Sequence, residues 1–353
     1  MKSHKTNTTG LEKASFLFFL LLATILVSGC DHSPEIIKIS GSKMGTSYHV
    51  TIVADQPAPA DLAEQIDQVL SAVDQSMSTY KKQSELSQFN RLPVSESVKA
   101  SDQLWSVLQT SEKIWRQSNA AFDPTVGPVV DLWGFGPVAT EDTIPQDQEI
   151  ATALENSGYE YLQLNSSDQT ISKQKAIALD LSAVAKGYAV DQVADLLEMY
   201  ALPDYLVEVG GEMRLSGTNP EGNPWRVAIE LPSLMPQVQQ VIAINNSAIA
   251  TSGDYRNYFE KDSVRYSHTI DPRQGKPITH NLASVTVMAD HCADADAWAT
   301  AFMVLGEQEG MRIAEQYAIP VYMLIRDGED FRVISSTAFE PYLQDSLDTP
   351  DEI

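Results

Sequence analysis

Oxygen-bearing side chains gather in one apolar, helix-forming stretch of this chain, ADADAWATAF (293–302). Asp294 and Asp296 lie at its start, and Thr300 follows Asp296 by four residues, which places Asp296 and Thr300 on one helix face. Carboxylate and hydroxyl oxygens suit Mg²⁺ or Ca²⁺. A structural interpretation stays open, with Asp294 as an N-cap or first-turn acid and Thr300 bonded back to the carbonyl of residue 296.

Two further stretches carry groups that could act on a phosphate ligand. In LDLSAVAKGYAVD (179–191), Lys186 and Gly187 stand early in a predicted helix, and a helix N-terminus with a nearby ammonium binds anions. In YSHTIDPRQGKPI (266–278), His268 precedes an Ile-Asp-Pro turn, and histidine transfers protons near neutral pH. Each has a simpler alternative, because Lys186 could be an exposed lysine and His268 a hydrogen-bonded structural residue.

Aromatic side chains could stack on a planar ligand at three places, Tyr80, Phe122 and Trp133, although each could instead belong to the core. The common nucleotide and hydrolase motifs are absent from the sequence. We find no G-x-x-x-x-G-K-[ST], no G-x-G-x-x-G after a strand, no H-E-x-x-H and no G-x-S-x-G. The sequence therefore supports neither a P-loop nor a Rossmann site.

Composition limits the classes of ligand that this 353-residue chain can bind. Its formal net charge is −24 without a basic patch, which argues against nucleic acid, because phosphate binding needs clustered Lys and Arg. A polyphosphate ligand would need a metal, backbone amides or a few placed cations. Once the N-terminal segment is removed, the only cysteine besides Cys30 is Cys292. No disulfide between two ordinary thiols is then expected within the chain, so stability must come from a packed core.

The N-terminus predicts export. Three lysines precede the apolar run SFLFFLLLATILV (15–27), which is too short to span a bilayer, and VSGC (27–30) resembles a bacterial lipobox. By that resemblance Cys30 is lipidated, and Asp31 resembles a signal for retention in the inner membrane, facing the periplasm. The alternative is an ordinary signal peptide with a coincidental cysteine. We assign 1–29 to the signal, 30–40 to the lipidated cysteine and a tether, 41–342 to one domain and 343–353 to an acidic tail.

The elements that must position these groups are predicted from periodicity and turn residues. Residues 36–54 read as two strands around a turn, and helical spacing appears in 59–80 and near 101–117. The Gly- and Pro-rich segment 119–137 indicates a binding loop. A strand ending at Asp180 precedes a helix that Ser182 could cap. Further predicted strands lie at 205–217, 225–232, 239–251, 264–270 and 283–289, with two more after the helix that starts near 293. Strands in hairpins with helices between them indicate an α+β fold.

Taken together, several stretches resemble the ApbE-type flavin transferase family over nearly the whole mature chain. The stretches that carry the resemblance are GSKMGTSYHVTI (41–52), STYKKQSELSQFN (78–90), FDPTVGPVVDLWGFG (122–136), LDLSAVAKGYAVD (179–191), VEVGGEM (207–213), TSGDYRNYFE (251–260), YSHTIDPRQGKPI (266–278) and DADAWATAFMVLG (294–306). The resemblance implies an α+β, T-fold-related architecture with antiparallel sheets and packed helices.

The resemblance also implies a reaction. Such enzymes cleave FAD and attach FMN through a phosphoester to a threonine of a target protein, typically a membrane redox subunit, and they release AMP. They use Mg²⁺ at the FAD pyrophosphate, and the metal ligands fall on the Ala183 carbonyl, Asp296 and Thr300. This assignment favours the metal interpretation of the ADADAWATAF stretch.

By the same resemblance, the contacts to FAD fall on Met44, Tyr80, Ala120, Ala121, Phe122, Asp180, Lys186, His268 and Ile270. We expect His268 to be the base that removes the threonine proton. Asp296 is the competing candidate, but a carboxylate bound to Mg²⁺ is a weaker base. Two other functions stay open at this point: an FAD pyrophosphatase that yields FMN and AMP, and a non-catalytic FAD-binding lipoprotein.

Overall fold

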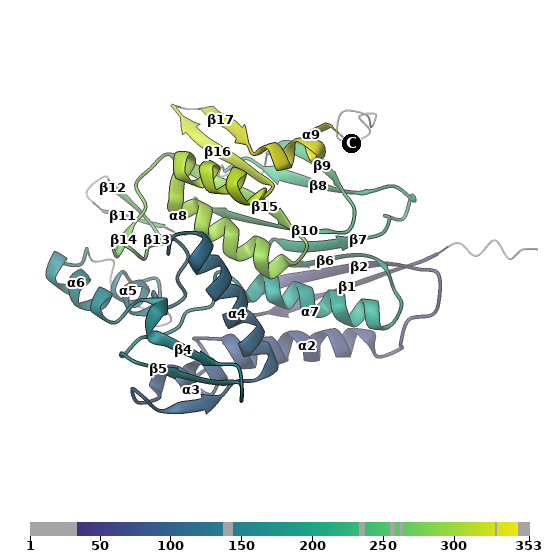
Figure 1. Cartoon of the computed structure of the whole chain (residues 1–353). Helices are drawn as coiled ribbons and strands as arrows, with labels where there is room; N and C mark the ends of the chain where they lie inside the picture. Colours follow the sequence, from purple (N-terminus) through teal and green to yellow (C-terminus); the bar gives the residue numbers. More distant parts are fainter. Residues whose placement is uncertain are drawn as a thin grey trace, which may run out of the picture.

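The computed structural model describes residues 34–136, 144–232, 237–254, 258–261, 264–328 and 330–344. An eight-stranded sheet in the order β1-β2-β6-β7-β10-β15-β16-β17 forms its centre, and all neighbouring strands are antiparallel (Figure 1). The strands are β1 (Glu35–Lys43), β2 (Thr46–Ala54), β6 (Asp204–Val209), β7 (Glu212–Ser216), β10 (Ser247–Gly253), β15 (Leu282–Ala289), β16 (Val321–Asp327) and β17 (Asp330–Ser335).

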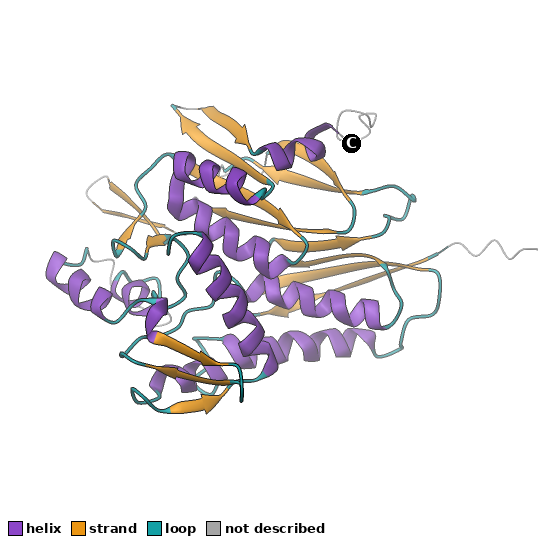
Figure 2. Cartoon of the chain, viewed as in Figure 1, coloured by secondary structure: helices purple, strands orange, loops and turns teal. Residues whose placement is uncertain are grey.

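Three helices cover one face of this sheet, α2 (Leu62–Met77), α7 (Ala185–Met199) and α8 (Cys292–Tyr317), and α4 (Asp102–Gln117) packs on α2 and α8 (Figure 2). In β2, alternate residues Tyr48, Val50 and Ile52 are buried against the helices, as the period of two in a strand requires. In α2, Leu62 and Ile66 begin a buried stripe at helical spacing. The main core therefore lies between the helices and the sheet.

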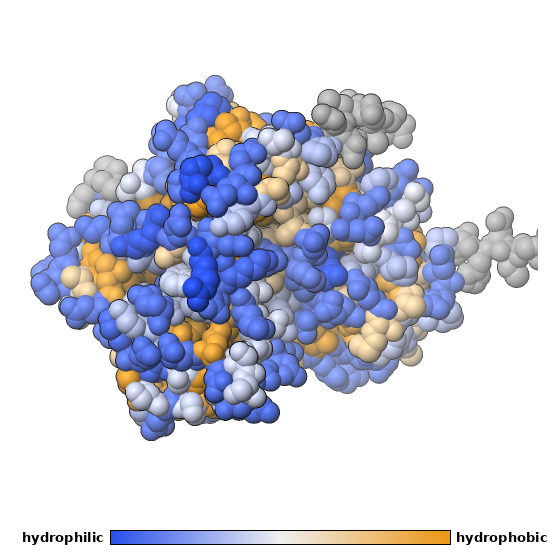
Figure 3. All heavy atoms as spheres, in the orientation of Figure 1, coloured by the Kyte–Doolittle hydropathy of each residue, from blue (hydrophilic) through white to orange (hydrophobic). Residues whose placement is uncertain are grey.

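A second core lies on the opposite face of the sheet. The hairpin of β8 (Trp225–Glu230) and β9 (Val238–Ile244) packs there with the short helices η2 (Thr337–Phe339) and α9 (Glu340–Gln344). Val53, which alternates with the main-core residues of β2, points into this second core. Both faces of the central strands are thus covered. Figure 3 shows that hydrophilic side chains cover much of the visible face, in keeping with the net charge of −24.

Smaller elements surround one end of the sheet. They are α3 (Glu85–Arg91), β3 (Ser97–Lys99), α5 (Gly127–Leu132), α6 (Asp147–Glu155), η1 (Tyr159–Tyr161), β4 (Leu162–Asn165), β5 (Thr170–Lys173), β11 (Tyr258–Lys261), β12 (Val264–Ser267), β13 (Ile270–Asp271) and β14 (Lys276–Pro277). An aromatic-rich cluster that includes Trp133, Phe259 and Ile270 joins α5 and α6 to the β11–β14 segments. This cluster holds the segment that carries His268 beside the 119–136 segment.

The predicted α+β class with antiparallel sheets is confirmed, and so are the helices predicted in 59–80 and 101–117. The segment predicted as a loop, 119–137, contains the helix α5, because Pro128 near its start suits the first turn of a helix. The predicted tether 30–40 is too long, since β1 begins at Glu35 and pairs with β2 along its whole length.

The turn before α7 also differs from the prediction. The strand predicted to end at Asp180 is reduced to an isolated bridge between Val126 and Ala178. Ser182 does not cap the helix, because α7 begins only at Ala185, with Val184 at the N-cap position. The Ser182 amide donates to the Asp180 carboxylate (2.8 Å) in a local turn. The polar side chain that shapes this turn is therefore Asp180.

The predicted signal 1–29, Cys30 and most of the acidic tail 343–353 lie outside the described residues. Among the helices that the structure describes, none is long and apolar enough to cross a membrane.

Candidate active site

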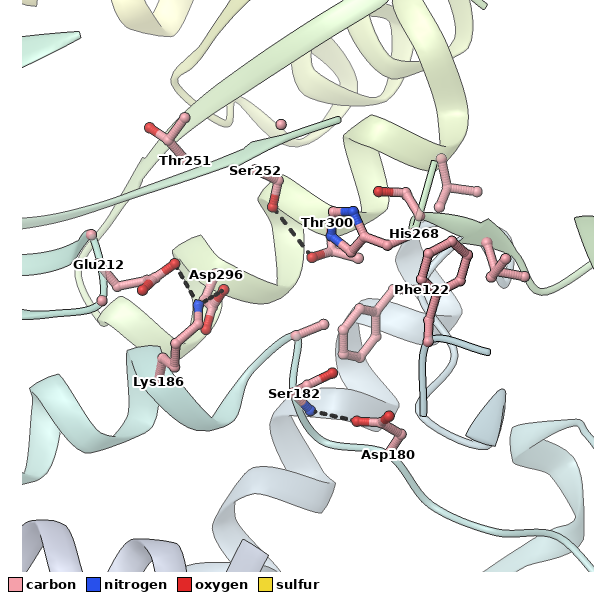
Figure 4. A pocket seen from close by; sticks show the side chains of 18 of the residues that line it. Phe122, Asp180, Ser182, Lys186, Glu212, Thr251, Ser252, His268, Asp296 and Thr300 are labelled. Carbon is pink, nitrogen blue, oxygen red and sulfur yellow. Dashed lines mark hydrogen bonds and ion pairs between the residues drawn. The ribbon is translucent and has the colours of Figure 1, made fainter. Parts of the chain in front are cut away.

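A cavity of about 850 Å³ opens where α7, α8, β10 and the turn between β6 and β7 meet the 120–136 segment (Figure 4). Such a volume lies in the upper part of the range typical of small-molecule sites. Ten of the residues predicted for the site line this cavity: Tyr80, Ala121, Phe122, Asp180, Ala183, Lys186, His268, Ile270, Asp296 and Thr300. Groups spread over more than 200 positions of sequence thus converge on one space.

The N-terminal end of α8 places Asp296 in the cavity. The helix is capped from α7, because the amides of Cys292 and Ala293 both donate to the Asp191 carboxylate (2.9 Å each). Asp294 is not the N-cap, since it lies within the helix and pairs with Lys113 of α4 (3.0 Å). The carboxylates of Asp294 and Asp296 therefore point to different places, and only Asp296 faces the cavity.

Close packing of α7 against α8 orients the Asp296 carboxylate. The amide of Gly187 donates to Asp296 Oδ2 (3.0 Å), and Asp296 is only 3% exposed. A Cβ atom at position 187 would lie 2.3 Å from the carbonyl oxygen of Cys292, so only glycine permits this approach. Because Oδ2 is held by a backbone group, Oδ1 is the oxygen left to face the cavity.

Lys186 stands between two carboxylates. Its Nζ lies 2.6 Å from Glu212 Oε1 and 3.8 Å from Asp296 Oδ1. Burial disfavours the Lys186 ammonium, but Asp296 and Glu212 outweigh this effect and raise its pKa, so Lys186 stays charged. Burial together with the charge of Asp296 raises the pKa of Glu212 to about 7, although Lys186 acts in the opposite direction. The ammonium is therefore a fixed positive charge in the cavity wall.

Thr300 lies one turn after Asp296 and faces the same cavity, as the spacing predicts. Its hydroxyl lies 3.4 Å from the hydroxyl of Ser252 on β10, and no back-bond to the carbonyl of residue 296 is recorded among the described residues. The carbonyl of Ala183 lies in the turn before α7. In a regular helix it would accept a hydrogen bond from the Gly187 amide four residues later, but that amide donates to Asp296 instead.

These oxygens form a donor set suited to a hard divalent cation. A carboxylate, a hydroxyl and a backbone carbonyl are Mg²⁺ ligands, and Mg²⁺ takes its remaining ligands from water or substrate phosphates. No group of three or more His, Cys, Asp or Glu side chains able to hold a metal occurs in the described ranges, so a cation here would depend on Asp296 for its protein carboxylate. The residues present fit Mg²⁺ bound together with a phosphate ligand.

The opposite side of the cavity is more apolar. Phe122 is buried and lines the cavity, whereas Tyr80 is 72% exposed at its rim. Asp180 accepts the amide of Ser182 and keeps its carboxylate at the cavity surface. His268 lies between β12 and β13, with its ring edge-on to Phe135 at a centroid distance of 6.4 Å. This side of the cavity can therefore hold an aromatic ligand next to His268, which could accept a proton.

Three predicted residues lie elsewhere. Met44 sits in the β1–β2 turn with a φ of 52° and packs against the main core, and Ala120, with a φ of 59°, lies beside the cavity without lining it. Trp133 is a core residue, since its indole donates to the Gly275 carbonyl (2.8 Å) and stacks on Tyr266. The alternative that Trp133 belongs to the core is therefore confirmed.

The sequence prediction missed Glu212 and Ser252, which line the cavity close to Lys186 and Thr300. Both occur within stretches that carry the family resemblance, VEVGGEM and TSGDYRNYFE, but neither stretch shows which residue faces a ligand. The sequence signal that could have indicated Glu212 is the glycine pair Gly210–Gly211. Both glycines have positive φ and so allow a tight turn just before Glu212.

Comparisons with known proteins agree on one family. Residues 44–323 match the ApbE family. The FAD:protein FMN transferase of Vibrio cholerae is 44% identical over 328 residues, which cover 92% of this chain and 97% of that protein. The structure resembles that of the Vibrio cholerae flavin transferase ApbE with a TM-score of 0.82, 43% identity and coverage of 88% and 100%. The apo flavinyl transferase ApbE of Pseudomonas stutzeri gives a TM-score of 0.81 at 36% identity, covering 88% and 97%.

Proposed function

This chain belongs to the ApbE family, and from that membership we infer that it is an FAD:protein FMN transferase. The observation that carries this inference is the 44% identity with the Vibrio cholerae transferase over 92% of the chain. The match to the ApbE family over residues 44–323 includes each of the segments that meet at the cavity. The enzyme takes FAD as its substrate and a protein as its acceptor. Transfer of FMN breaks the pyrophosphate of FAD and leaves AMP as the other product.

We propose that the reaction depends on Mg²⁺, held by Asp296, Thr300 and the Ala183 carbonyl. The donor chemistry and the location of all three at one cavity support this assignment. Mg²⁺ would neutralise charge on the pyrophosphate as the phosphoryl group is transferred. The Lys186 ammonium would supply a second fixed positive charge, and the Gly187 amide would keep Asp296 in place.

We also propose that a threonine hydroxyl is the acceptor and that His268 removes its proton. A hydroxyl is a poor nucleophile, and a histidine base typically contributes about 10²–10⁴-fold to such a step. His268 supports this role because it lines the cavity on the side of Phe122, across from Asp296. Asp296 is the weaker candidate for the base, since its carboxylate is held by the Gly187 amide and would bind the cation.

The test of the function is mass spectrometry of the purified chain mixed with Mg²⁺, FAD and a threonine-bearing acceptor protein. Covalent FMN on the acceptor together with AMP is the expected result. Free FMN plus AMP would indicate an FAD pyrophosphatase, and absence of AMP would indicate a protein that only binds FAD. Omitting Mg²⁺ with EDTA in a parallel reaction tests the metal, and a Thr→Ala acceptor tests the attachment residue.

The sequence further supports a proposal for location. We propose that Cys30 is lipidated and anchors the enzyme to the inner membrane, facing the periplasm, where a membrane redox subunit would be the acceptor. The basic N-terminus, the short apolar run and the VSGC tetrapeptide followed by Asp31 support this proposal. An anchored enzyme would meet membrane-bound acceptors at a raised local concentration.

A further inference from the structure

Glu212 begins β7, directly after the Gly210–Gly211 turn, and contributes a carboxylate to the cavity wall. Only 5% of the residue is exposed. One oxygen, Oε1, lies 2.6 Å from Lys186 Nζ, whereas the other, Oε2, is buried and has no hydrogen-bond partner in the part of the chain that the structure describes. A buried oxygen without a partner destabilises a fold, so stability alone does not explain this carboxylate.

The ammonium of Lys186 lies near two carboxylates, and it is closer to Glu212 than to Asp296. Figure 4 shows it between Glu212 and Asp296. Its Nζ lies 2.6 Å from Glu212 Oε1 and 3.8 Å from Asp296 Oδ1. Asp296 cannot turn toward Lys186 without losing the bond from the Gly187 amide to Oδ2. As long as Glu212 holds Lys186, no cationic side chain of the described residues lies at hydrogen-bond distance from Asp296 Oδ1.

We propose that Glu212 is a positioning residue that holds the Lys186 ammonium away from Asp296 and so keeps Asp296 Oδ1 available to a divalent cation. The inference rests on the proposed function, because it takes Asp296 as a ligand of that cation. Without Glu212, the flexible Lys186 side chain closes on Asp296 and forms a direct ion pair. That ion pair competes with the cation for the same oxygen.

Coulomb's law sets the size of the effect. Closing the distance between Lys186 Nζ and Asp296 Oδ1 from 3.8 Å to hydrogen-bond distance, at an effective dielectric constant of about 20, corresponds to about tenfold weaker cation binding. The affinity for FAD should change by less than about threefold, because Lys186 keeps its charge and stays in the cavity wall.

The experiment measures Mn²⁺ binding by electron paramagnetic resonance, with saturating FAD and no acceptor, in the wild type and in Glu212→Gln. We expect the Kd for Mn²⁺ to rise about tenfold, while the Kd for FAD, measured by fluorescence without metal, stays close to that of the wild type. Glu307→Gln is the matched control. It makes the same substitution on α8, the helix that carries Asp296, but Glu307 pairs with Arg332 (2.8 Å) and does not line the cavity, so the Mn²⁺ affinity of this variant should equal that of the wild type.

Lys186→Met distinguishes this role from a simple effect of charge. In chains that carry Lys186→Met, adding Glu212→Gln should leave the Mn²⁺ affinity unchanged, because no ammonium remains to be held. An equal loss of affinity with and without Lys186 would show that Glu212 acts through its own charge and would overturn the proposal. So would unchanged Mn²⁺ binding in the single variant.

If Glu212→Gln does not fold, Glu212→Asp replaces it, since it keeps the charge but shortens the side chain by one methylene. It should weaken Mn²⁺ binding when Lys186 is present and leave it unchanged in the Lys186→Met chain. Failure of the wild type to bind Mn²⁺ would remove the metal site and this inference with it, whereas covalent FMN on an acceptor would still establish the transfer function.

Discussion

Replacing Gly187 with alanine tests whether the contact between α7 and α8 orients the site. The added methyl carbon would lie 2.3 Å from the Cys292 carbonyl oxygen and 2.8 Å from the Ala293 nitrogen, and both are backbone atoms that no rotamer change can move. Ordinary contact begins at 3.4 Å, so the helices must separate by about 1 Å. That movement stretches the bond from the Gly187 amide to Asp296 Oδ2.

The expected loss of stability combines three effects. Overpacking of a core costs about 1–3 kcal/mol, and a buried hydrogen bond to a charged group contributes about 1.5–3 kcal/mol. Alanine regains about 0.8–1 kcal/mol through its helix propensity. We therefore expect Gly187→Ala to lower the free energy of unfolding by about 1.5–5 kcal/mol. Because misplacement of a catalytic group by about 1 Å can cost about 10²-fold, FMN transfer should fall by a similar factor.

Urea unfolding and the FMN-transfer assay measure these two losses. Gly310→Ala is the matched control, since Gly310 also lies buried in a helix, but the closest atom to its added methyl is the flexible end of Met323, at 3.0 Å, and Phe302 lies at ordinary contact distance, 3.4 Å or more. The control should not lose stability, and its helix propensity can raise the free energy of unfolding by up to about 1 kcal/mol. A Gly187→Ala chain with wild-type stability and transfer rate would refute the argument that this contact positions Asp296.

Three further predictions follow from the site and the N-terminus. His268→Asn should lose about 10²–10⁴-fold in transfer rate with little change in FAD affinity, and its rate should respond less to pH near neutrality. Equal losses in FAD binding and transfer would make His268 a binding residue. Asp296→Asn keeps the size of the side chain and removes its charge, so Mg²⁺-dependent transfer should collapse while circular dichroism stays that of the wild type; unchanged dependence on Mg²⁺ would exclude Asp296 as a ligand. Cys30→Ser should leave an unprocessed precursor without acyl groups, as seen by mass spectrometry, and normal processing to a soluble form would contradict the lipobox interpretation.

Much of the fold and of the site could be predicted because the relevant signals are local. Helical spacing identified α2 and α4, and the four-residue interval between Asp296 and Thr300 placed both on one face before any partner was known. The family resemblance implied which residues belong to the site, and ten of them line one cavity. Periodicity failed in the 119–137 segment, where Gly and Pro suggest a loop although six residues form α5.

Other features depended on residues far apart in the chain, and only the tertiary structure decided them. Asp294 and Asp296 are only two positions apart in the sequence, which does not show which of them faces a ligand. Packing against α4 pairs Asp294 with Lys113, whereas Asp296 faces the cavity. The cap of α8 comes from Asp191 on α7, not from the residues just before the helix. A local pattern fixes the face of an element on which a side chain lies, whereas its partner is set by distances between elements that only packing brings together.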